Sequence, residues 1–100
     1  MLLERRVVSG KTAVDGKLEV SAETAARLAA IGNALAVVYQ GATESARIES
    51  MTCTCAKRSG EPHIHHFVTS PVLKSLGAGA QVSLELSPET TTLRIEPVSE

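Results

Sequence analysis

The sequence predicts a mainly β protein: one small, duplicated β-barrel domain over residues 1–100, with about seven strands and two short helices. Three observations support this fold class. Apolar and polar residues alternate in short stretches such as 82–86. Turn-forming residues interrupt these stretches at short intervals. The two halves of the chain also show the same order of elements, and closure into a barrel would remove the exposed strand edges that each half has alone.

The first half begins with strands predicted at 5–8 and 17–20, separated by a glycine-bearing connection. Ser21 then offers a side-chain oxygen as the N-cap of a helix over 22–31, and Gly32-Asn33 ends this helix. Because apolar residues recur on one side of it, the helix is expected to bury a narrow stripe. The stripe consists of Ala25, Leu28, Ala29 and Ile31.

The second half repeats the order of elements in the first. The first half continues with a strand at 34–39, a turn at 41–45 and a strand at 46–50. In the second half, a strand at 66–69 and a helix at 70–76 correspond to the strand at 17–20 and the helix at 22–31. A strand at 80–86, a turn at 87–90 and a strand at 93–97 then correspond to the three elements that end the first half. Each half ends in an Arg-Ile-Glu triplet. The sequence therefore predicts an internal repeat of 18–50 and 66–97, with a Cys/His hairpin at 51–66 between the two copies.

The second helix has its own start signals. Ser70 can cap it, and Pro71 occupies the first helical position, where proline is favoured. Val72, Leu73 and Leu76 are expected to face the core. Because Tyr39 and Phe67 are the only aromatic residues, that core must be built from aliphatic side chains.

Composition and charge limit the function classes. The formal net charge is −1, so bulk electrostatics favour neither nucleic acid nor an anionic membrane. The N-terminus lacks the apolar stretch of a signal peptide, and no segment has the roughly 20 apolar residues of a membrane span. Two closely spaced thiols without further cysteines are typical of a reducing compartment. The sequence thus predicts a cytoplasmic protein that does not contact a membrane.

The ligand types that zinc prefers are concentrated in the middle of the chain. Cys53 and Cys55 are the only cysteines, and the only histidines are His63, His65 and His66. If these segments are adjacent antiparallel strands closed by a turn at 57–62, residues two apart share a face. Two thiolates and two imidazoles then converge as in a closed tetrahedral zinc site. We predict zinc bound by Cys53, Cys55, His63 and His65, with His66 as an alternative ligand if the hairpin is bulged.

Other interpretations of this segment stay open. Cys53 and Cys55 can be small buried residues beside surface histidines, or they can form a redox pair. A disulfide between them is disfavoured by the strained ring that it would close.

The order of elements resembles the DNA-binding pseudobarrel superfamily. This superfamily includes plant B-three-type domains and effector domains of restriction endonucleases, with AbrB-type proteins as more distant relatives. The similar segments are Gly16–Ser21, Phe67-Val68 and Leu73–Leu84. The acidic residue that follows the glycine in the family is Ala80 in this chain. The resemblance implies a small pseudobarrel that contacts double-stranded DNA.

In that family two arms hold the DNA, and the corresponding segments of this chain carry its two clusters of cations. These residues are Arg5, Arg6 and Lys11 on one arm, and Lys57 and Arg58 on the other. Cations on two flanking loops can neutralise phosphates on both sides of a groove. The alternative is that they are solvated surface residues, diluted by Glu4, Asp15 and Glu61.

Two other functions remain as alternatives. The first is a protein-interaction barrel, which would use the strand edge at 47–50 or 94–96 for a protein partner or for self-association. The second is a cupin-like metal enzyme, suggested by His63-Ile-His65 in a small β fold. The later glutamate and the additional histidine of cupin motifs are absent, and Glu61 is the only acid close by in sequence.

Overall fold

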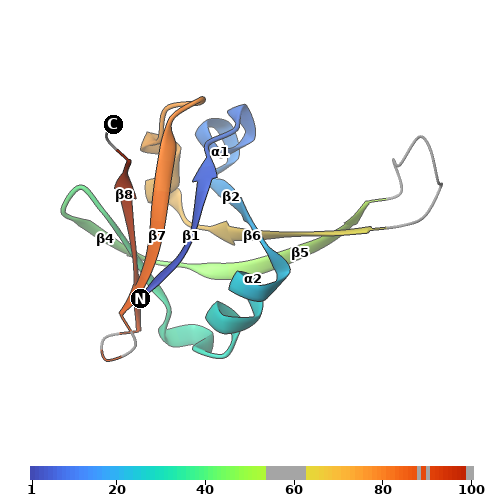
Figure 1. The fold of residues 1–100 in the computed structure, drawn as a ribbon, viewed down its shortest axis with the longest axis vertical. Helices are drawn as coiled ribbons and strands as arrows, with labels where there is room; N and C mark the ends of the chain where they lie inside the picture. The colour runs from blue at the N-terminus through green and yellow to red at the C-terminus, as the bar shows by residue number, and fades with distance from the viewer. Residues whose placement is uncertain (54–62, 88, 90, 99–100) are drawn as a thin grey trace.

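The computed structural model describes residues 1–53, 63–87, 89 and 91–98 and shows a mainly β fold (Figure 1). Two α-helices and two 3₁₀ turns accompany eight strands in this part of the chain. In chain order the elements are β1 (Leu2–Val7), α1 (Gly10–Asp15), β2 (Lys17–Val20), α2 (Ala22–Ala29), η1 (Gly32–Ala34), β3 (Ala36–Tyr39), β4 (Ala42–Ser45), β5 (Arg47–Cys53), β6 (His63–Thr69), η2 (Pro71–Ser75), β7 (Gln81–Ser87) and β8 (Thr92–Pro97).

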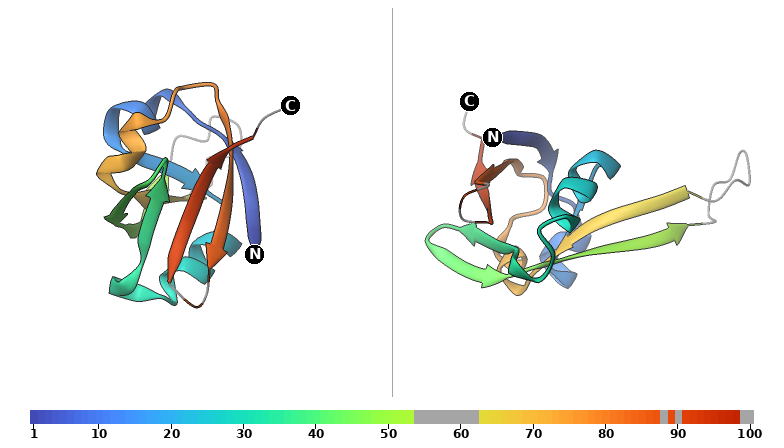
Figure 2. Two further views of the ribbon diagram at one scale, coloured as in Figure 1. Left: turned by 90° about the vertical axis from the view of Figure 1, so that its left-hand side faces the viewer. Right: turned by 90° about the horizontal axis from the view of Figure 1, so that it is seen from below.

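The strands form two open sheets rather than one closed barrel. The larger sheet has the order β1-β7-β8-β3-β4, and the smaller one has the order β2-β6-β5. The chain passes from one sheet to the other at Ala46, whose N–H donates to Leu35 O at 3.0 Å. Figure 2 shows the two sheets from two further directions.

Polar contacts span the opening between β1 and β2. Side chains bridge the two strands where a closed barrel would have a backbone ladder. Arg6 Nε donates to Glu19 O at 2.9 Å, and Ser21 N donates to Glu4 Oε1 at 3.0 Å. The expected closure is therefore replaced by polar side-chain contacts, and both strands are left as sheet edges.

The first helix in the chain was not expected from the sequence. Residues 9–16 were predicted to be a connection, but Gly10–Asp15 forms α1. Gly16 ends this helix in the left-handed region at φ 70°, and its N–H donates to Thr12 O at 2.9 Å. A glycine at this position is a common helix stop, so Gly16 is the signal that could have identified α1.

Two further elements differ from the expectation. The turn placed at 41–45 is shorter, because Gln40 and Gly41 both have positive φ, at 50° and 82°, as in a two-residue hairpin loop. Residues 42–45 therefore pair with β3 as strand β4. The helix expected at 70–76 is the 3₁₀ turn η2, with Pro71 at its first position as predicted.

The core is aliphatic, as the composition indicated. Val72, Leu73 and Leu76 face inward as predicted, and Ala25 and Leu28 form the buried stripe of α2. Ala29 is exposed instead, and Thr24 is buried beside Ala25. Fully buried leucines complete the core: Leu18, Leu84 and Leu93 from the two sheets, and Leu35 from the position just before β3.

The predicted repeat units begin with two strands that pair with each other. β2 and β6 run antiparallel with Leu18 opposite Val68, and each is followed by a short helical element. The two Arg-Ile-Glu triplets lie on β5 and β8, which belong to different sheets. The internal repeat stays a prediction. No helix among the described residues is long and apolar enough to cross a membrane.

Candidate functional site on the three-stranded sheet

The Cys/His segment is built on an antiparallel hairpin, as the sequence predicted. β5 pairs with β6 over its whole described length, and the register places Cys53 opposite His63 and Met51 opposite His65. The hairpin extends beyond the core, where Met51 and Ile64 are exposed (Figure 1). The other predicted residues of this segment lie outside the described residues: Cys55, Lys57 and Arg58.

Strand alternation assigns the histidines to two faces. Positions 63 and 65 belong to one face of β6, together with positions 51 and 53 of the facing strand. His66 lies on the opposite face, where its Nδ1 is 2.8 Å from Ser50 Oγ. His66 therefore lies on the opposite face of β6 from His65, and the predicted ligand set itself stays a prediction.

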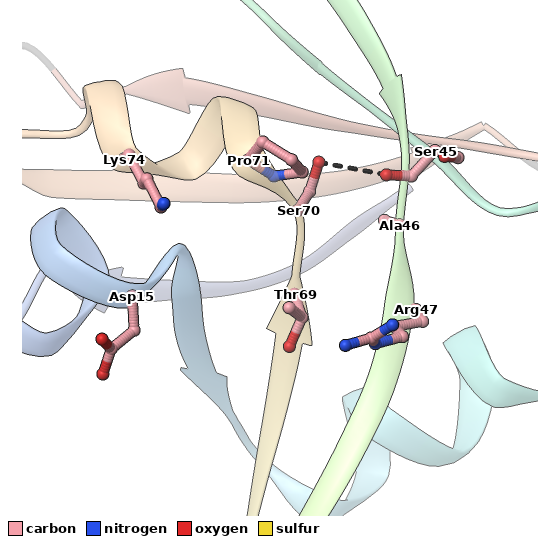
Figure 3. Close-up of a pocket in the computed structure, with 8 residues that line it drawn as sticks. All are labelled: Asp15, Ser45, Ala46, Arg47, Thr69, Ser70, Pro71 and Lys74. Atoms are coloured by element: carbon pink, nitrogen blue, oxygen red, sulfur yellow. Dashed lines mark hydrogen bonds between the residues drawn. The ribbon is translucent and has the colours of Figure 1, made fainter.

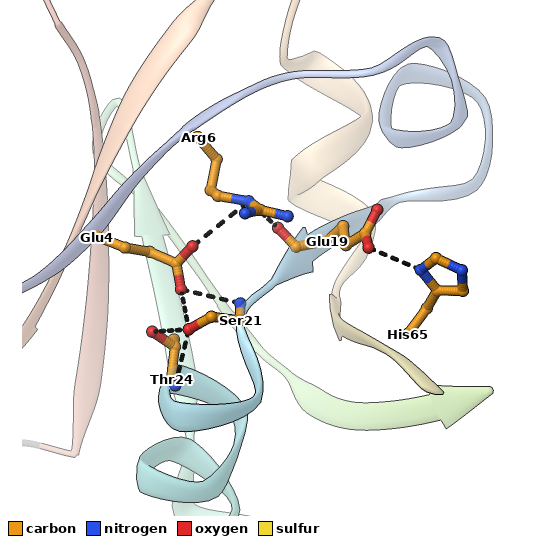
Figure 4. Close-up of polar contacts among 6 residues, drawn as sticks. All are labelled: Glu4, Arg6, Glu19, Ser21, Thr24 and His65. Atoms are coloured by element: carbon orange, nitrogen blue, oxygen red, sulfur yellow. Dashed lines mark hydrogen bonds and ion pairs between the residues drawn. The ribbon is translucent and has the colours of Figure 1, made fainter. Parts of the chain in front are cut away.

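His65 is oriented by a carboxylate from the neighbouring strand β2. Its Nδ1 lies 2.8 Å from Glu19 Oε2, and Figure 4 shows the ring held against the strand by this contact. Glu19 thereby fixes the orientation of the His65 ring, as carboxylates do for metal-bound histidines. Glu19 could not be identified from the sequence pattern, because it lies on a strand 46 residues away from His65.

No group of three or more His, Cys, Asp or Glu side chains gathers at a metal-sized site within the described ranges. The complete predicted set also requires Cys55, which lies beyond them. Zinc thus remains a prediction. The same holds for the cupin-like alternative, because Glu61 also lies outside the described residues.

The predicted nucleic-acid contacts of the first arm lie in three different environments. Arg5 is exposed on β1, opposite Ser83 in the five-stranded sheet. Arg6 is held by Glu19 O and lies 3.4 Å from Glu4 Oε2. The Lys11 ammonium lies 5.4 Å from the centre of the Phe67 ring, a cation–π contact. Arg6, through Glu19 O of β2, and Lys11, through the Phe67 ring of β6, therefore both contact the three-stranded sheet that includes the Cys/His hairpin.

Glu4 is the centre of the polar contacts between β1 and the start of α2 (Figure 4). Burial by itself would raise the pKa of this carboxyl, but hydrogen bonds from Thr24 and Ser21 and the nearby Arg6 guanidinium outweigh burial. The pKa of Glu4 is consequently held below its ordinary value of 4.5. The ionised carboxylate joins the strand to the capped helix.

A pH dependence of stability follows from this lowered pKa. Because the pKa is lower in the folded state, the contribution is fully present above the unfolded value of 4.5 and is lost as pH falls through the folded value. We expect Glu4→Gln to reduce the loss of thermal stability between about pH 5 and pH 3. Melting curves across this range test it, with Glu23→Gln, an exposed partner of Arg27, as the control. Equal pH profiles for the wild type and Glu4→Gln would contradict the assignment.

The outer face of the three-stranded sheet carries cations that the sequence did not indicate. Lys17, Thr69 and Arg47 stand side by side on β2, β6 and β5. Glu49 interacts with both cations, at 3.9 Å from Lys17 Nζ and 3.3 Å from Arg47 Nε. These residues are scattered along the sequence, and only the register brings them together.

Glu49 remains ionised between Lys17 and Arg47. The Thr69 hydroxyl lies close enough to lower the pKa of the Glu49 carboxyl, and Arg47 and Lys17 lower it further against the opposing effect of burial. The approach of Thr69 falls short of a well-formed hydrogen bond, and its buried oxygen has no such partner among the described residues. One carboxylate thus lies between two cations.

A pocket of about 380 Å³ opens beside this row, where α1, β6 and η2 meet the chain segment between β4 and β5 (Figure 3). Lys74 and Arg47 contribute positive charge from different sides, and Asp15 contributes a carboxylate. Ser70 Oγ donates to Ser45 O at 3.1 Å and fixes the back wall. The full lining is Asp15, Ser45, Ala46, Arg47, Thr69, Ser70, Pro71 and Lys74.

Comparison with known proteins finds no matching family model, no matching curated protein and no matching solved structure.

Proposed function

We propose that this protein is a small zinc-stabilised β binding module that contacts double-stranded DNA. One observation carries the proposal: the β5–β6 register places Cys53 opposite His63, with His65 on the same face and oriented by Glu19. Cys55 follows two residues after Cys53, and strand alternation would place it on that face as well. Two thiolates and two imidazoles would give zinc its closed tetrahedral set.

Zinc bound in this way would be structural. Four protein ligands leave no open position for a water or a substrate, which catalysis would need. The ion would link β5 and β6 where the hairpin extends beyond the core and Met51 and Ile64 are exposed. Its role would be to present the segment between the strands, which carries Lys57 and Arg58, in one conformation.

The proposed DNA contact uses this segment together with the adjacent sheet face. Lys11 and Lys17 lie on that face, next to the β6 strand of the hairpin. Lysine and arginine side chains on it can neutralise successive phosphates. Glu19 and Glu49 lie on the same face and oppose this attraction. Binding is therefore expected to be modest and strongly dependent on salt.

The test is fluorescence anisotropy of a labelled duplex across a salt series. We expect a slope of log affinity against log salt that corresponds to about three to five neutralised phosphates, at roughly 0.9 per contact. Replacing Lys57 and Arg58 together with glutamine should lower the slope by about 2 contacts. Arg27→Gln/Arg94→Gln removes the same charge from α2 and β8 and serves as the matched control.

Comparison of the two double variants distinguishes DNA binding at a defined site from attraction by the overall charge of the protein. An equal decrease in both would indicate attraction without a defined interface. If no duplex binds at any salt concentration, the proposal of DNA contact fails and a protein-interaction module is favoured.

That second candidate has its own observation. β5 lies at the edge of the three-stranded sheet, as the interaction hypothesis for 47–50 requires, and β4 is an edge strand whose residues are all exposed. The other predicted edge, 94–96, is wrong because β8 lies between β7 and β3, with Arg94 opposite both Glu85 and Val38. A protein strand could therefore add to β4 or β5 but not to β8.

A further inference from the structure

We propose that the pocket formed by Asp15, Arg47, Thr69, Ser70 and Lys74 binds a phosphate group. Its volume of about 380 Å³ lies within the range of small-molecule sites. The phosphate can belong to a nucleic-acid backbone or to a small phosphorylated molecule. For the nucleic-acid backbone, the inference rests on the function proposed above.

The cations of the pocket remain available to a ligand. The Lys74 ammonium makes no ion pair or hydrogen bond with the described part of the chain. Arg47 uses Nε for Glu49, its terminal nitrogens extend toward Thr69 in Figure 3, and its side chain is 74% exposed. An ammonium and a guanidinium approaching from two sides are suited to the oxygens of one phosphate group.

Hydroxyl groups would add the remaining hydrogen bonds. Thr69 Oγ1 lies close to Glu49 and is buried without a well-formed hydrogen bond in the described residues, so it could donate to a ligand oxygen after a rotation of its side chain. Ser45 also lines the wall. Ser70 already donates to Ser45 O and therefore acts on the shape of the pocket rather than on the ligand.

Asp15 restricts which phosphate compounds fit. Its carboxylate would repel a phosphate oxygen placed next to it, so the anionic group belongs on the side of Lys74 and Arg47. An ionised carboxylate accepts hydrogen bonds but donates none. We therefore expect a hydroxyl or amino group adjacent to the phosphate to be directed at Asp15, as a sugar phosphate or a nucleotide could provide.

The backbone of the pocket is fixed before any ligand arrives. Gly16 follows Asp15 directly, and its carbonyl accepts from Ser70 N at 3.0 Å. A Cβ at Gly16 would lie 2.8 Å from Ser70 O and 3.4 Å from a Lys74 side-chain carbon. The absence of a side chain at this position therefore lets the Asp15 and Lys74 walls approach one another.

The experiment is a titration of the isotope-labelled protein with inorganic phosphate at constant ionic strength, followed by amide NMR. We expect saturable shifts confined to the segments 15–17, 45–47 and 69–74. Lys74→Gln should weaken the apparent affinity about tenfold or more, since a charged hydrogen bond is lost. Arg27→Gln, on α2, should bind phosphate like the wild type. Unchanged affinity in Lys74→Gln, or equal shifts with chloride, would overturn the inference.

A parallel titration with duplex DNA separates the two phosphate sources. Phosphate binding that depends on Lys74, without DNA binding, supports the pocket for a small phosphorylated molecule and refutes DNA as the partner. If the protein binds DNA and Lys74→Gln weakens this binding, the result supports the pocket as the binding site of a backbone phosphate. DNA binding that Lys74→Gln does not change, without phosphate binding, refutes the pocket inference and leaves the proposed function standing.

Discussion

Gly16→Ala is expected to be the most damaging alanine substitution among the described glycines, lowering the free energy of unfolding by about 2–3 kcal/mol. Two causes act together. Gly16 has φ 70°, where a Cβ is strained, and that Cβ would lie 2.8 Å from the backbone oxygen of Ser70. A backbone atom cannot rotate away as the end of a side chain can, so α1 and η2 would have to separate.

Two other glycines are the matched controls. Gly32 has φ 71° but open space around its missing Cβ, so Gly32→Ala should show the strain alone, about 1 kcal/mol. Gly10 has neither constraint and lies in α1, so Gly10→Ala should be neutral or slightly stabilising. Urea denaturation of the three variants measures the differences. If Gly16→Ala costs no more than Gly32→Ala, the close approach to Ser70 does not contribute to stability.

Removal of the proposed zinc ligands should have the second large effect. We expect the purified protein to hold about one zinc per chain and Cys53→Ser/Cys55→Ser to hold none, because each thiolate supplies one of four ligands. Chelation should lower the thermal midpoint by several degrees, because binding the ion is coupled to ordering the hairpin. Metal analysis and melting curves with and without chelator measure both effects.

His66→Ala is the control for this prediction, since His66 lies on the opposite face beside Ser50 and should not affect zinc content. Glu19→Gln should leave all four ligands in place but weaken zinc binding roughly 10- to 100-fold, because the His65 ring loses its carboxylate. Zinc content near zero in the wild type, or an unchanged content in the double cysteine variant, would end the hypothesis. Full stability after verified removal of zinc would show an adventitious ion rather than a structural one.

Local sequence signals were sufficient to predict the elements that are defined by capping residues, by proline or by alternation of apolar and polar residues. Ser21 begins α2 and accepts from Thr24 N, as its N-cap pattern indicated. Pro71 begins η2, and the alternation of Val82, Leu84 and Leu86 places all three in the core. In each case the deciding interaction lies within a few residues along the chain.

The Cys/His hairpin was predictable for a similar reason. β5 and β6 are neighbours in sequence as well as in the sheet, so an antiparallel pairing with Cys53 near His63 was the simplest arrangement. Lys17, Arg47 and Lys74 gave no comparable signal. Lys17 and Arg47 lie far apart in the chain and share a face because β2 and β5 pair with opposite sides of β6, and Lys74 lines the neighbouring pocket from η2.

The amino-acid sequence by itself therefore determined the mainly β character, the aliphatic core and the concentration of thiols and imidazoles in one short segment of the chain. Alternation, capping and composition act over short distances, where chain connectivity limits the possible partners. Tertiary structure decided the opening of the sheets, the contact of Glu19 with His65 and the pocket beside Arg47. These features depend on which distant strands become neighbours, and that choice is made by packing of the whole core rather than by any single segment.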